Sequence, residues 1–231
     1  MSLHFKHYIF DLDNTLYHSS SAFFNQQLEK MSSFICDLLK VTKAEADFLR
    51  DDYYRSYGTT MHGLIHNHGI QAEKFLSTID AVPLDRLQPD EALLALLLQL
   101  KQAGKQLCVF TNGSDYHARR VMKKLQLDQI IEDVVTLEST GLIPKPDKRA
   151  YQHLLKTLNI EPTDAVFFED SSHNLIPAKA LGMQTVLVNA DETAHARFIA
   201  HKEIDLLVED IEHYFNRKYL FSRLPETMKA T

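Results

Sequence analysis

The sequence lacks several features that would place a protein in a class at first sight. It has two cysteines among 231 residues, Cys36 and Cys108, so we expect no disulfide framework; Cys108 lies in an apolar run, as a buried thiol does. The formal net charge is −6, so there is no basic surplus and we expect no nucleic-acid partner. A small phosphorylated partner is compatible with this charge, because a metal ion and one lysine can meet the phosphate charge locally.

Long hydrophobic runs are also absent. The longest aliphatic run, residues 92–98, is far shorter than the roughly 18 residues that span a bilayer. The N-terminus leads directly into an apolar segment without the pattern of a secretory signal peptide. We therefore expect a soluble cytoplasmic protein with no membrane partner. Apolar residues make up 45% and charged residues 24%, as in average globular domains, so a folded core is expected.

Short apolar runs typical of buried strands recur along the chain, and a helix-like segment follows each of them. Four are clear and the last named is weaker: residues 5–10, 106–111, 165–169, 184–189 and 133–137. Alternating strands and helices are typical of a doubly wound parallel sheet. Continuous apolar runs fit strands that are buried on both faces. We therefore predict an α/β fold with a Rossmann-like parallel sheet.

No strand pattern occurs between about residues 16 and 90. Apolar residues recur there at steps of three and four, as in amphipathic helices. Because a structureless stretch of this length is uncommon in a compact domain, we predict a helical cap inserted after the first strand, as a lid over its carboxyl end. The expected division is a core of residues 1–16 and 90–220, a cap of residues 17–89 and a frayed tail of residues 221–231.

Two aspartates, Asp11 and Asp13, follow the first apolar run. In a strand, residues i and i+2 point to the same side, so we predict that both carboxylates face one cavity at the carboxyl end of the sheet. Two like charges are costly to bury together unless a cation or a proton lies between them. A loop start with solvated side chains is the alternative.

Polar residues also follow the later strands. After the second strand come Thr111, Asn112 and Gly113, where a hydroxyl and backbone amides before a helix suit a phosphate group. A simple helix cap by Thr111 or Ser114 is the alternative. Lys145 lies between two prolines, which restrict its backbone and suit a cation aimed at a fixed point.

An acidic pair, Glu169 and Asp170, ends a third apolar run. Acidic residues at this place either begin a helix, where the macrodipole stabilises them, or hold a hard divalent cation such as Mg²⁺. In a doubly wound sheet the ends of successive strands converge on one crevice. We therefore expect all of these groups to form a single site.

Taken in order, the Asp-x-Asp run, the hydroxyl, the lysine and the acidic pair resemble the four motifs of the haloacid dehalogenase-like hydrolases. The resemblance covers the chain to about residue 210. It implies that Asp11 is a nucleophile that forms an aspartyl-phosphate. It also implies that Asp13 is the general acid and base, a role for which we expect a raised pKa.

The same resemblance implies a Mg²⁺ ion and its ligands. These are Asp11, Asp170, the backbone carbonyl of Asp13, and Glu169 acting through a water. Thr111, the amide of Asn112 and Lys145 would neutralise the phosphoryl oxygens, and Asn174 would orient the acidic loop. True dehalogenases of this family lack an acid at the position of Asp13, so the chain is similar to the phosphohydrolases.

Within this family, the insertion resembles that of the pyrimidine 5′-nucleotidases. The similar segments are Asn14 to Tyr17, Tyr53-Tyr54 before Gly58, Gly63-Leu64 before His66, Leu87 to Asp90, and Asn112 to Arg119. Gly113 departs from the alanine expected there. The resemblance implies dephosphorylation of nucleoside monophosphates similar to UMP or CMP. The substrate-binding residues would be Tyr53, Tyr57, His66, Asn112 and Gly113.

Several alternatives stay open. An aromatic side chain in the cap can stack on a nucleobase, but Tyr53 and Tyr57 are four residues apart and at least one of them is expected to pack the cap's own core. A sugar-phosphate phosphatase or a phosphomutase would use the same site. A non-catalytic partner-binding member of the family is a further alternative, against which the complete polar set speaks. The sequence predicts no oligomeric state.

Overall fold

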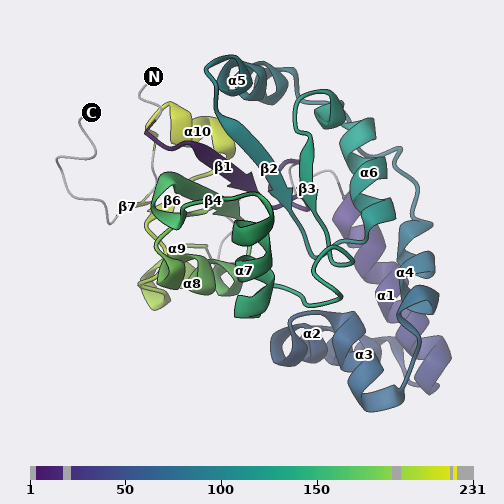
Figure 1. Cartoon of the computed structure of the whole chain (residues 1–231). Coiled ribbons are helices and arrows are strands. Elements are labelled where there is room, and N and C mark those ends of the chain that lie inside the picture. Colours follow the sequence, from purple (N-terminus) through teal and green to yellow (C-terminus); the bar gives the residue numbers. More distant parts are fainter. Residues whose placement is uncertain (1–3, 18–21, 189–193, 219–220, 223–231) are drawn as a thin grey trace. The chain divides into compact units, whose positions relative to one another are not determined.

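The computed structural model describes residues 4–17, 22–188, 194–218 and 221–222. It divides into two compact units, one made of residues 1–18 and 88–231 and the other of residues 19–87. Figure 1 shows the elements of each unit. Among the described residues, no helix is both long enough and apolar enough to cross a membrane.

The larger unit contains a seven-stranded sheet in the order β3-β2-β1-β4-β5-β6-β7. The strands are β1 His7–Phe10, β2 Gln106–Phe110, β3 Asp133–Val135, β4 Ala165–Glu169, β5 Gln184–Leu187, β6 Leu206–Leu207 and β7 Phe221–Ser222. The first six pair in parallel, and β7 pairs antiparallel with β6. This topology confirms the predicted doubly wound α/β sheet. The order reverses between β1 and β4, which is where such sheets bind ligands.

The central strands are apolar because both of their faces are covered. Every residue of β1 and β4 is buried. Phe10 pairs with Phe168 in the register of β1 and β4, and their rings stack at 5.0 Å between centroids. The register also sets Phe10 opposite Val109 of β2, so the three strands end at nearly the same level. Polar residues that follow these strands therefore lie close together.

Helices connect the strands of the larger unit. They are α5 Glu91–Gln102, α6 Asp115–Lys124, α7 Lys148–Thr157, α8 Ser172–Leu181, α9 Ala194–Ala200 and α10 Ile211–Phe215. Local sequence explains where several of them begin. The side chains of Asp90, Ser114 and Asp147 accept hydrogen bonds from the first turns of α5, α6 and α7. The chain turns at the end of α8 through Gly182, which has φ of 104°.

The smaller unit is a helical insertion, as predicted. Its helices are α1 Phe23–Leu39, α2 Lys43–Tyr57, α3 Thr60–His68 and α4 Ala72–Asp80. A capping box formed by Thr42 and Glu45 begins α2. Helices α2 and α3 approach closely at Gly63, where an added Cβ would lie 2.3 Å from Cβ of Tyr53. The role of this unit as a cap stays a prediction.

The end of the sheet differs from the sequence expectation. Strands β6 and β7 were not predicted, since each has two residues and two residues carry no periodicity. The predicted frayed tail is wrong for Phe221 and Ser222, because backbone pairing with β6 places them in the sheet. Residues 223–231 of that tail lie outside the described residues.

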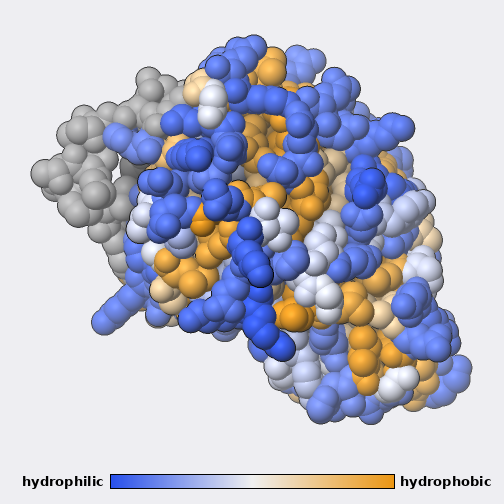
Figure 2. Space-filling model, in the orientation of Figure 1, coloured by the Kyte–Doolittle hydropathy of each residue, from blue (hydrophilic) through white to orange (hydrophobic). Residues whose placement is uncertain are grey.

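Large hydrophobic side chains that are exposed come from several different helices. Examples are Phe48 of α2, Tyr116 of α6 and Ile199 of α9. On the face drawn in Figure 2, hydrophobic side chains are interspersed with hydrophilic ones. Scattered exposed hydrophobic side chains are usual and indicate no particular partner.

Candidate active site

The polar residues singled out in the sequence follow β1, β2 and β4, beside the reversal in strand order. Asp11 comes directly after β1, and its backbone N–H donates to Phe168 O of β4 at 2.9 Å. Thr111 comes directly after β2, and its N–H donates to Val135 O of β3 at 3.0 Å. Glu169 is the last residue of β4. The backbone of the sheet therefore fixes all three positions.

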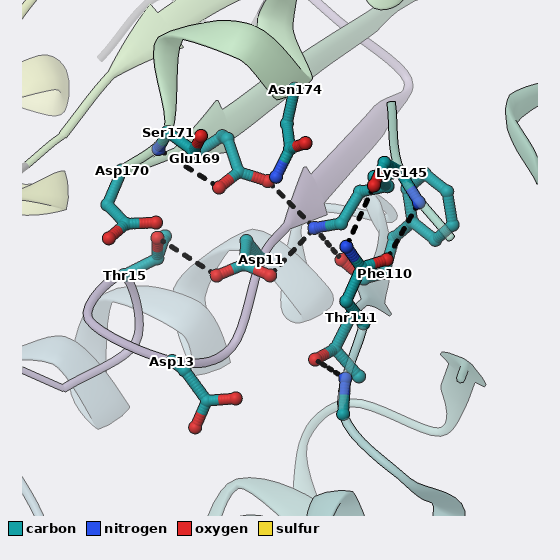
Figure 3. Close-up of polar contacts among 12 residues, drawn as sticks. Asp11, Asp13, Thr15, Phe110, Thr111, Lys145, Glu169, Asp170, Ser171 and Asn174 are labelled. Atoms are coloured by element: carbon teal, nitrogen blue, oxygen red, sulfur yellow. Dashed lines mark hydrogen bonds and ion pairs between the residues drawn. The ribbon is translucent and has the colours of Figure 1, made fainter. Parts of the chain in front are cut away.

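Lys145 connects all three of these strand ends. Its Nζ donates three hydrogen bonds of 2.7 Å, to Asp11 Oδ1, to Glu169 Oε2 and to Phe110 O (Figure 3). The side chain is 1% exposed, and the rings of Phe110 and Phe167 lie 5.1 and 5.3 Å from Nζ. An ammonium has three protons to donate, and here protein oxygens accept all three. Lys145 is thus the counter-charge of Asp11 and Glu169, and a direct contact with substrate would replace one of these bonds.

The backbone of Lys145 is held as firmly as its side chain. Its N–H donates to Asn112 Oδ1 at 2.7 Å, and its carbonyl accepts from Asn112 Nδ2 at 3.0 Å. The amide side chain of Asn112 thus joins the end of β2 to the Pro-Lys-Pro loop. The two bonds to Lys145 therefore occupy the Asn112 side chain, which we expected to bind substrate. The backbone N–H of Asn112 takes no part in these two bonds.

Three carboxylates gather beside this lysine. One oxygen each of Asp11, Glu169 and Asp170 lies within 4.8 Å of the others. Both oxygens of Glu169 accept hydrogen bonds, Oε2 from Lys145 and Oε1 from Ser171 N at 3.1 Å. Asp170 Oδ2 accepts from Asn14 Nδ2 at 3.4 Å, while the buried Asn14 Oδ1 has no hydrogen-bond partner in the part of the chain that the structure describes. Asp11 and Asp170 are therefore better placed than Glu169 to bind a cation. Glu169 serves mainly as an ion-pair partner of Lys145.

Burial and mutual repulsion raise the pKa of each of these acids. Burial, followed by the charge of Glu169, raises the pKa of Asp11 to about 8. Burial raises the pKa of Glu169 to about 7, although Lys145 opposes this. Burial and Asp11 raise the pKa of Asp170 to about 6. One ammonium does not balance three carboxylates, so the donor set fits a divalent cation that prefers oxygen ligands, such as Mg²⁺.

Asp13 is not a member of this three-carboxylate cluster, although its charge acts on Asp11 and the charge of Lys145 acts on it. Strand β1 ends at Phe10, and the chain turns at once, with Leu16 N donating to Leu12 O at 3.0 Å. The alternation of a strand therefore does not extend to Asp13. In Figure 3 its carboxylate points away from the Asp11–Lys145 pair.

The neighbours with the largest effect on Asp13 are hydrogen-bond donors, whereas the neighbour with the largest effect on Asp11 is a carboxylate. Its Oδ1 accepts from Tyr17 OH at 2.7 Å and from His117 Nε2 at 2.8 Å. Burial alone would raise the pKa of Asp13, but His117 and Tyr17 outweigh it, and the pKa is lowered. The raised pKa that we expected for a general acid is thus wrong for this structure, since two hydrogen-bond donors stabilise the ionised form.

The turn after β2 completes the site. Thr111 Oγ1 accepts from Gly113 N at 2.9 Å, and Ser114 Oγ accepts from His117 N at 2.9 Å as the N-cap of α6. Ser114 therefore has the capping role that the sequence left open, and Thr111 keeps its hydroxyl proton available for donation. An added Cβ at Gly113 would lie 3.7 Å from Asp13 Oδ2, so this turn adjoins the second aspartate.

Residues 8–188 match the haloacid dehalogenase-like hydrolase family, which is more than half of the chain. The chain belongs to the haloacid dehalogenase-like hydrolases. It is 31% identical over 195 residues to Phosphate metabolism protein 8 of Saccharomyces cerevisiae, with 79% of this chain and 61% of that protein covered. It thus spans about three fifths of this relative's length.

Two further comparisons agree with this family. The chain is 28% identical over 190 residues to Glyceraldehyde 3-phosphate phosphatase of Methanocaldococcus jannaschii, covering 78% of this chain and 83% of that protein. A solved structure of a HAD phosphatase from Thermococcus onnurineus superposes with a TM-score of 0.62 at 20% identity, covering 92% and 97% of the two chains. At that identity, the likeness shows the fold alone.

Of the substrate-binding residues expected in the insertion, Tyr53 serves the packing of the smaller unit. Tyr53 is buried, its OH lies 2.7 Å from His68 Nε2, and its ring contacts Tyr57 edge to face. Tyr53 is thus the tyrosine that packs the insertion's own core. Tyr57 is half-buried and its ring lies 5.1 Å from the exposed His66, so these two stay candidates for substrate contact.

Sequence reasoning assigned no role in the site to several residues that the structure places there. Asn14, Thr15 and Tyr17 follow Asp13 in one turn, where Thr15 Oγ1 donates to Asp11 Oδ2 at 3.4 Å. His117 comes from α6, 104 residues away from Asp13. The family-like segments Asn14 to Tyr17 and Asn112 to Arg119 contain these residues, but no local pattern pairs them.

Proposed function

We propose that this hydrolase is a Mg²⁺-dependent phosphatase that removes phosphate from small phosphomonoesters through an aspartyl-phosphate. The observation that carries the proposal is the buried Asp11, paired with Lys145 through Oδ1; among the described residues, its Oδ2 accepts only the 3.4 Å bond from Thr15. A carboxylate held at a ligand-binding sheet edge beside a fixed cation suits attack on an electrophile that carries negative charge.

In the first half of the reaction, an Asp11 oxygen forms a bond to phosphorus and the bond to the ester oxygen breaks. Asp13 gives a proton to the leaving alkoxide, which departs as an alcohol. The lowered pKa of Asp13 is compatible with this step because a phosphate dianion beside it adds negative charge and raises that pKa. Thr111 and the backbone amide of Asn112 stabilise the phosphoryl oxygens.

In the second half, water attacks the phosphorus of the aspartyl-phosphate. Asp13, now ionised, takes a proton from this water, and Asp11 leaves as a carboxylate. Asp11, Asp170 and the carbonyl of Asp13 would hold Mg²⁺, which when bound neutralises charge on the phosphate and on the acids. Lys145 and Glu169 remain paired throughout and keep Asp11 in place.

We propose pyrimidine nucleoside monophosphates as the first substrate class. The support is the resemblance of the insertion and of segments 14–17 and 112–119 to the pyrimidine 5′-nucleotidases, together with Tyr57 and His66, whose paired rings are not fully buried. A sugar phosphate is the second candidate, favoured by the likeness to Glyceraldehyde 3-phosphate phosphatase.

The test is phosphate release from UMP, CMP, purine monophosphates, glyceraldehyde 3-phosphate and hexose phosphates, with Mg²⁺ and with EDTA. We expect activity that requires Mg²⁺ and falls at least about 10³-fold in Asp11→Asn, because the nucleophile is lost. Asp128→Asn is the matched control, since Asp128 is exposed and remote in sequence from every motif.

Three outcomes would change the proposal. Release from sugar phosphates alone would retain the mechanism and exclude the nucleotidase assignment. Equal activity of wild type and Asp11→Asn would exclude Asp11 as the nucleophile. No release from any ester of the panel would exclude the phosphatase function proposed here.

A further inference from the structure

We propose that His117 and Tyr17 are positioning residues that anchor the Asp13 carboxylate by Oδ1 and direct its Oδ2 to the leaving group, beside Gly113. This inference rests on the proposed function, because it assigns Asp13 to the leaving-group oxygen. It concerns two side chains for which the reaction itself requires no role.

The first observation is that both hydrogen bonds to Asp13 end on the same oxygen. Tyr17 OH lies 2.7 Å and His117 Nε2 lies 2.8 Å from Oδ1. The two donors come from separate parts of the larger unit, the turn after β1 and the first turn of α6. A carboxylate held from two directions at one oxygen has its side-chain torsions fixed, and the position of Oδ2 is fixed with them.

The second observation is that burial and a backbone hydrogen bond fix the position of His117. Its side chain is 4% exposed, and its backbone N–H donates to the capping Ser114 at 2.9 Å. Helix α6 begins directly after the turn of Thr111 and Gly113, so the His117 ring is placed by the same segment that forms the expected phosphate cradle. The position of the Asp13 carboxylate relative to the turn of Thr111 and Gly113 is thereby fixed.

The third observation concerns the space beside Oδ2. An added Cβ at Gly113 would lie 2.8 Å from His117 Cδ2, 3.2 Å from Thr111 Oγ1 and 3.7 Å from Asp13 Oδ2. A methyl group here would therefore press on the His117 ring and occupy the volume next to Oδ2. Glycine at this position leaves that volume free of protein side chain.

These three observations assign different tasks to the two oxygens of Asp13. Oδ1 is bound to the protein and fixes direction, while Oδ2 exchanges a proton with the leaving oxygen. Transfer of a proton in a transition state depends on alignment at a distance of about 3 Å, so a carboxylate that rotates freely would lose much of its effect. Tyr17 and His117 supply the alignment.

A test that separates positioning from general structural support compares two kinds of leaving group. The ester 2,4-dinitrophenyl phosphate releases a stable phenolate and needs little proton donation, whereas UMP or glyceraldehyde 3-phosphate releases an alkoxide that needs a proton. We would measure kcat/KM for both kinds of ester with His117→Phe, His117→Gln and Tyr17→Phe. This ratio reports the steps up to phosphoryl transfer to Asp11 and leaves out the hydrolysis of the aspartyl-phosphate, which both esters share.

For His117→Phe we expect kcat/KM on the alkyl ester to fall about 10- to 100-fold, a part of the roughly 10²- to 10⁴-fold that general acid–base catalysis contributes. On the dinitrophenyl ester the fall in kcat/KM should stay below about 3-fold, because the leaving phenolate needs little proton donation. Glutamine has an amide that can donate in place of Nε2, so His117→Gln should recover much of the loss. Tyr17→Phe, which lacks only a hydroxyl, should show a smaller loss with the same dependence on the leaving group.

Equal losses on both esters in Tyr17→Phe and His117→Phe would overturn the inference and leave these residues a structural role. Unchanged kcat/KM on the alkyl ester in both variants would overturn it as well. If His117→Phe does not fold, Tyr17→Phe alone decides, because it removes only a hydroxyl group and leaves the ring in place. Failure of the wild type to hydrolyse either ester would instead overturn the proposed function.

Discussion

Lys145 has two buried carboxylates as its partners, and its removal would leave both without a counter-charge. Lys145→Met keeps a similar length but has no charge. We expect it to lower the free energy of unfolding by about 3–5 kcal/mol, as is usual when one partner of a buried ion pair is removed. Urea unfolding at pH 8 measures this, because Asp11 and Glu169 with pKa values of about 8 and 7 are more protonated, and so less affected, at lower pH.

The control for this variant is Lys156→Met, an exposed lysine of α7 that should change stability little. Lys145→Met combined with Glu169→Gln should recover part of the stability, since one unpaired charge is removed together with its partner. It should recover no activity, because Asp11 still lacks its cation. A Lys145→Met protein as stable as the wild type would contradict the ion-pair assignment.

At the same scale, the sequence was informative about residue types and uninformative about long-range partners. The order of Asp11, Thr111, Lys145 and Glu169 along the chain sufficed to place them together, since parallel strands end at one edge. The direction of the Asp13 side chain was not predictable, because it depends on β1 ending at Phe10 rather than two residues later. The bond to His117 spans 104 residues and leaves no local pattern.

Among the elements, the contact of α2 with α3 depends on one small residue. A Cβ at Gly63 would lie 2.3 Å from both Cβ and Cγ of Tyr53, atoms close to the backbone that have little freedom to move. Gly63→Ala should therefore push the helices apart and lower stability by about 1–3 kcal/mol, despite the better helix propensity of alanine. Far-UV circular dichroism during urea unfolding measures the change.

Ser33→Ala is the matched control, an exposed position on α1 of the same unit, where the change should stay within about 0.5 kcal/mol. If Gly63→Ala were as stable as the wild type, the close approach of the two helices would be refuted. Because Tyr57 follows Tyr53 on the same helix, displaced helices should also change the KM of the substrate before they change kcat, on the proposal that Tyr57 contacts it.

Helices and strands were predictable from the sequence where their periodic or continuous apolar pattern covered at least four residues. The runs at β1, β2, β4 and β5 have four or five residues and were found, as was the helical character of the insertion. The two-residue strands β6 and β7 were missed because backbone pairing with a neighbour defines them, and their side chains show no pattern. The three-residue β3 was placed two residues too long at its end, in the turn at Thr136.

For the molecule as a whole, the acidic cluster links stability to pH and to a divalent cation. The pKa values of Asp11, Glu169 and Asp170 are raised to about 8, 7 and 6, whereas these groups titrate near 4 in an unfolded chain. Between about pH 4 and pH 8 the folded protein then binds more protons than the unfolded one. The contribution of these three groups to stability therefore falls as pH rises through this range.

A bound Mg²⁺ ion would favour the ionised acids and remove this dependence, so we expect the stabilisation by Mg²⁺ to grow from pH 5 to pH 8. The measurement is the free energy of unfolding in Mg²⁺ minus that in EDTA at each pH. Taking this difference cancels the opposite effect of His7, whose burial lowers its pKa. Asp170→Asn should reduce both the slope in EDTA and the gain from Mg²⁺. A gain that is constant from pH 5 to pH 8 would mean that the cation binds away from these three carboxylates.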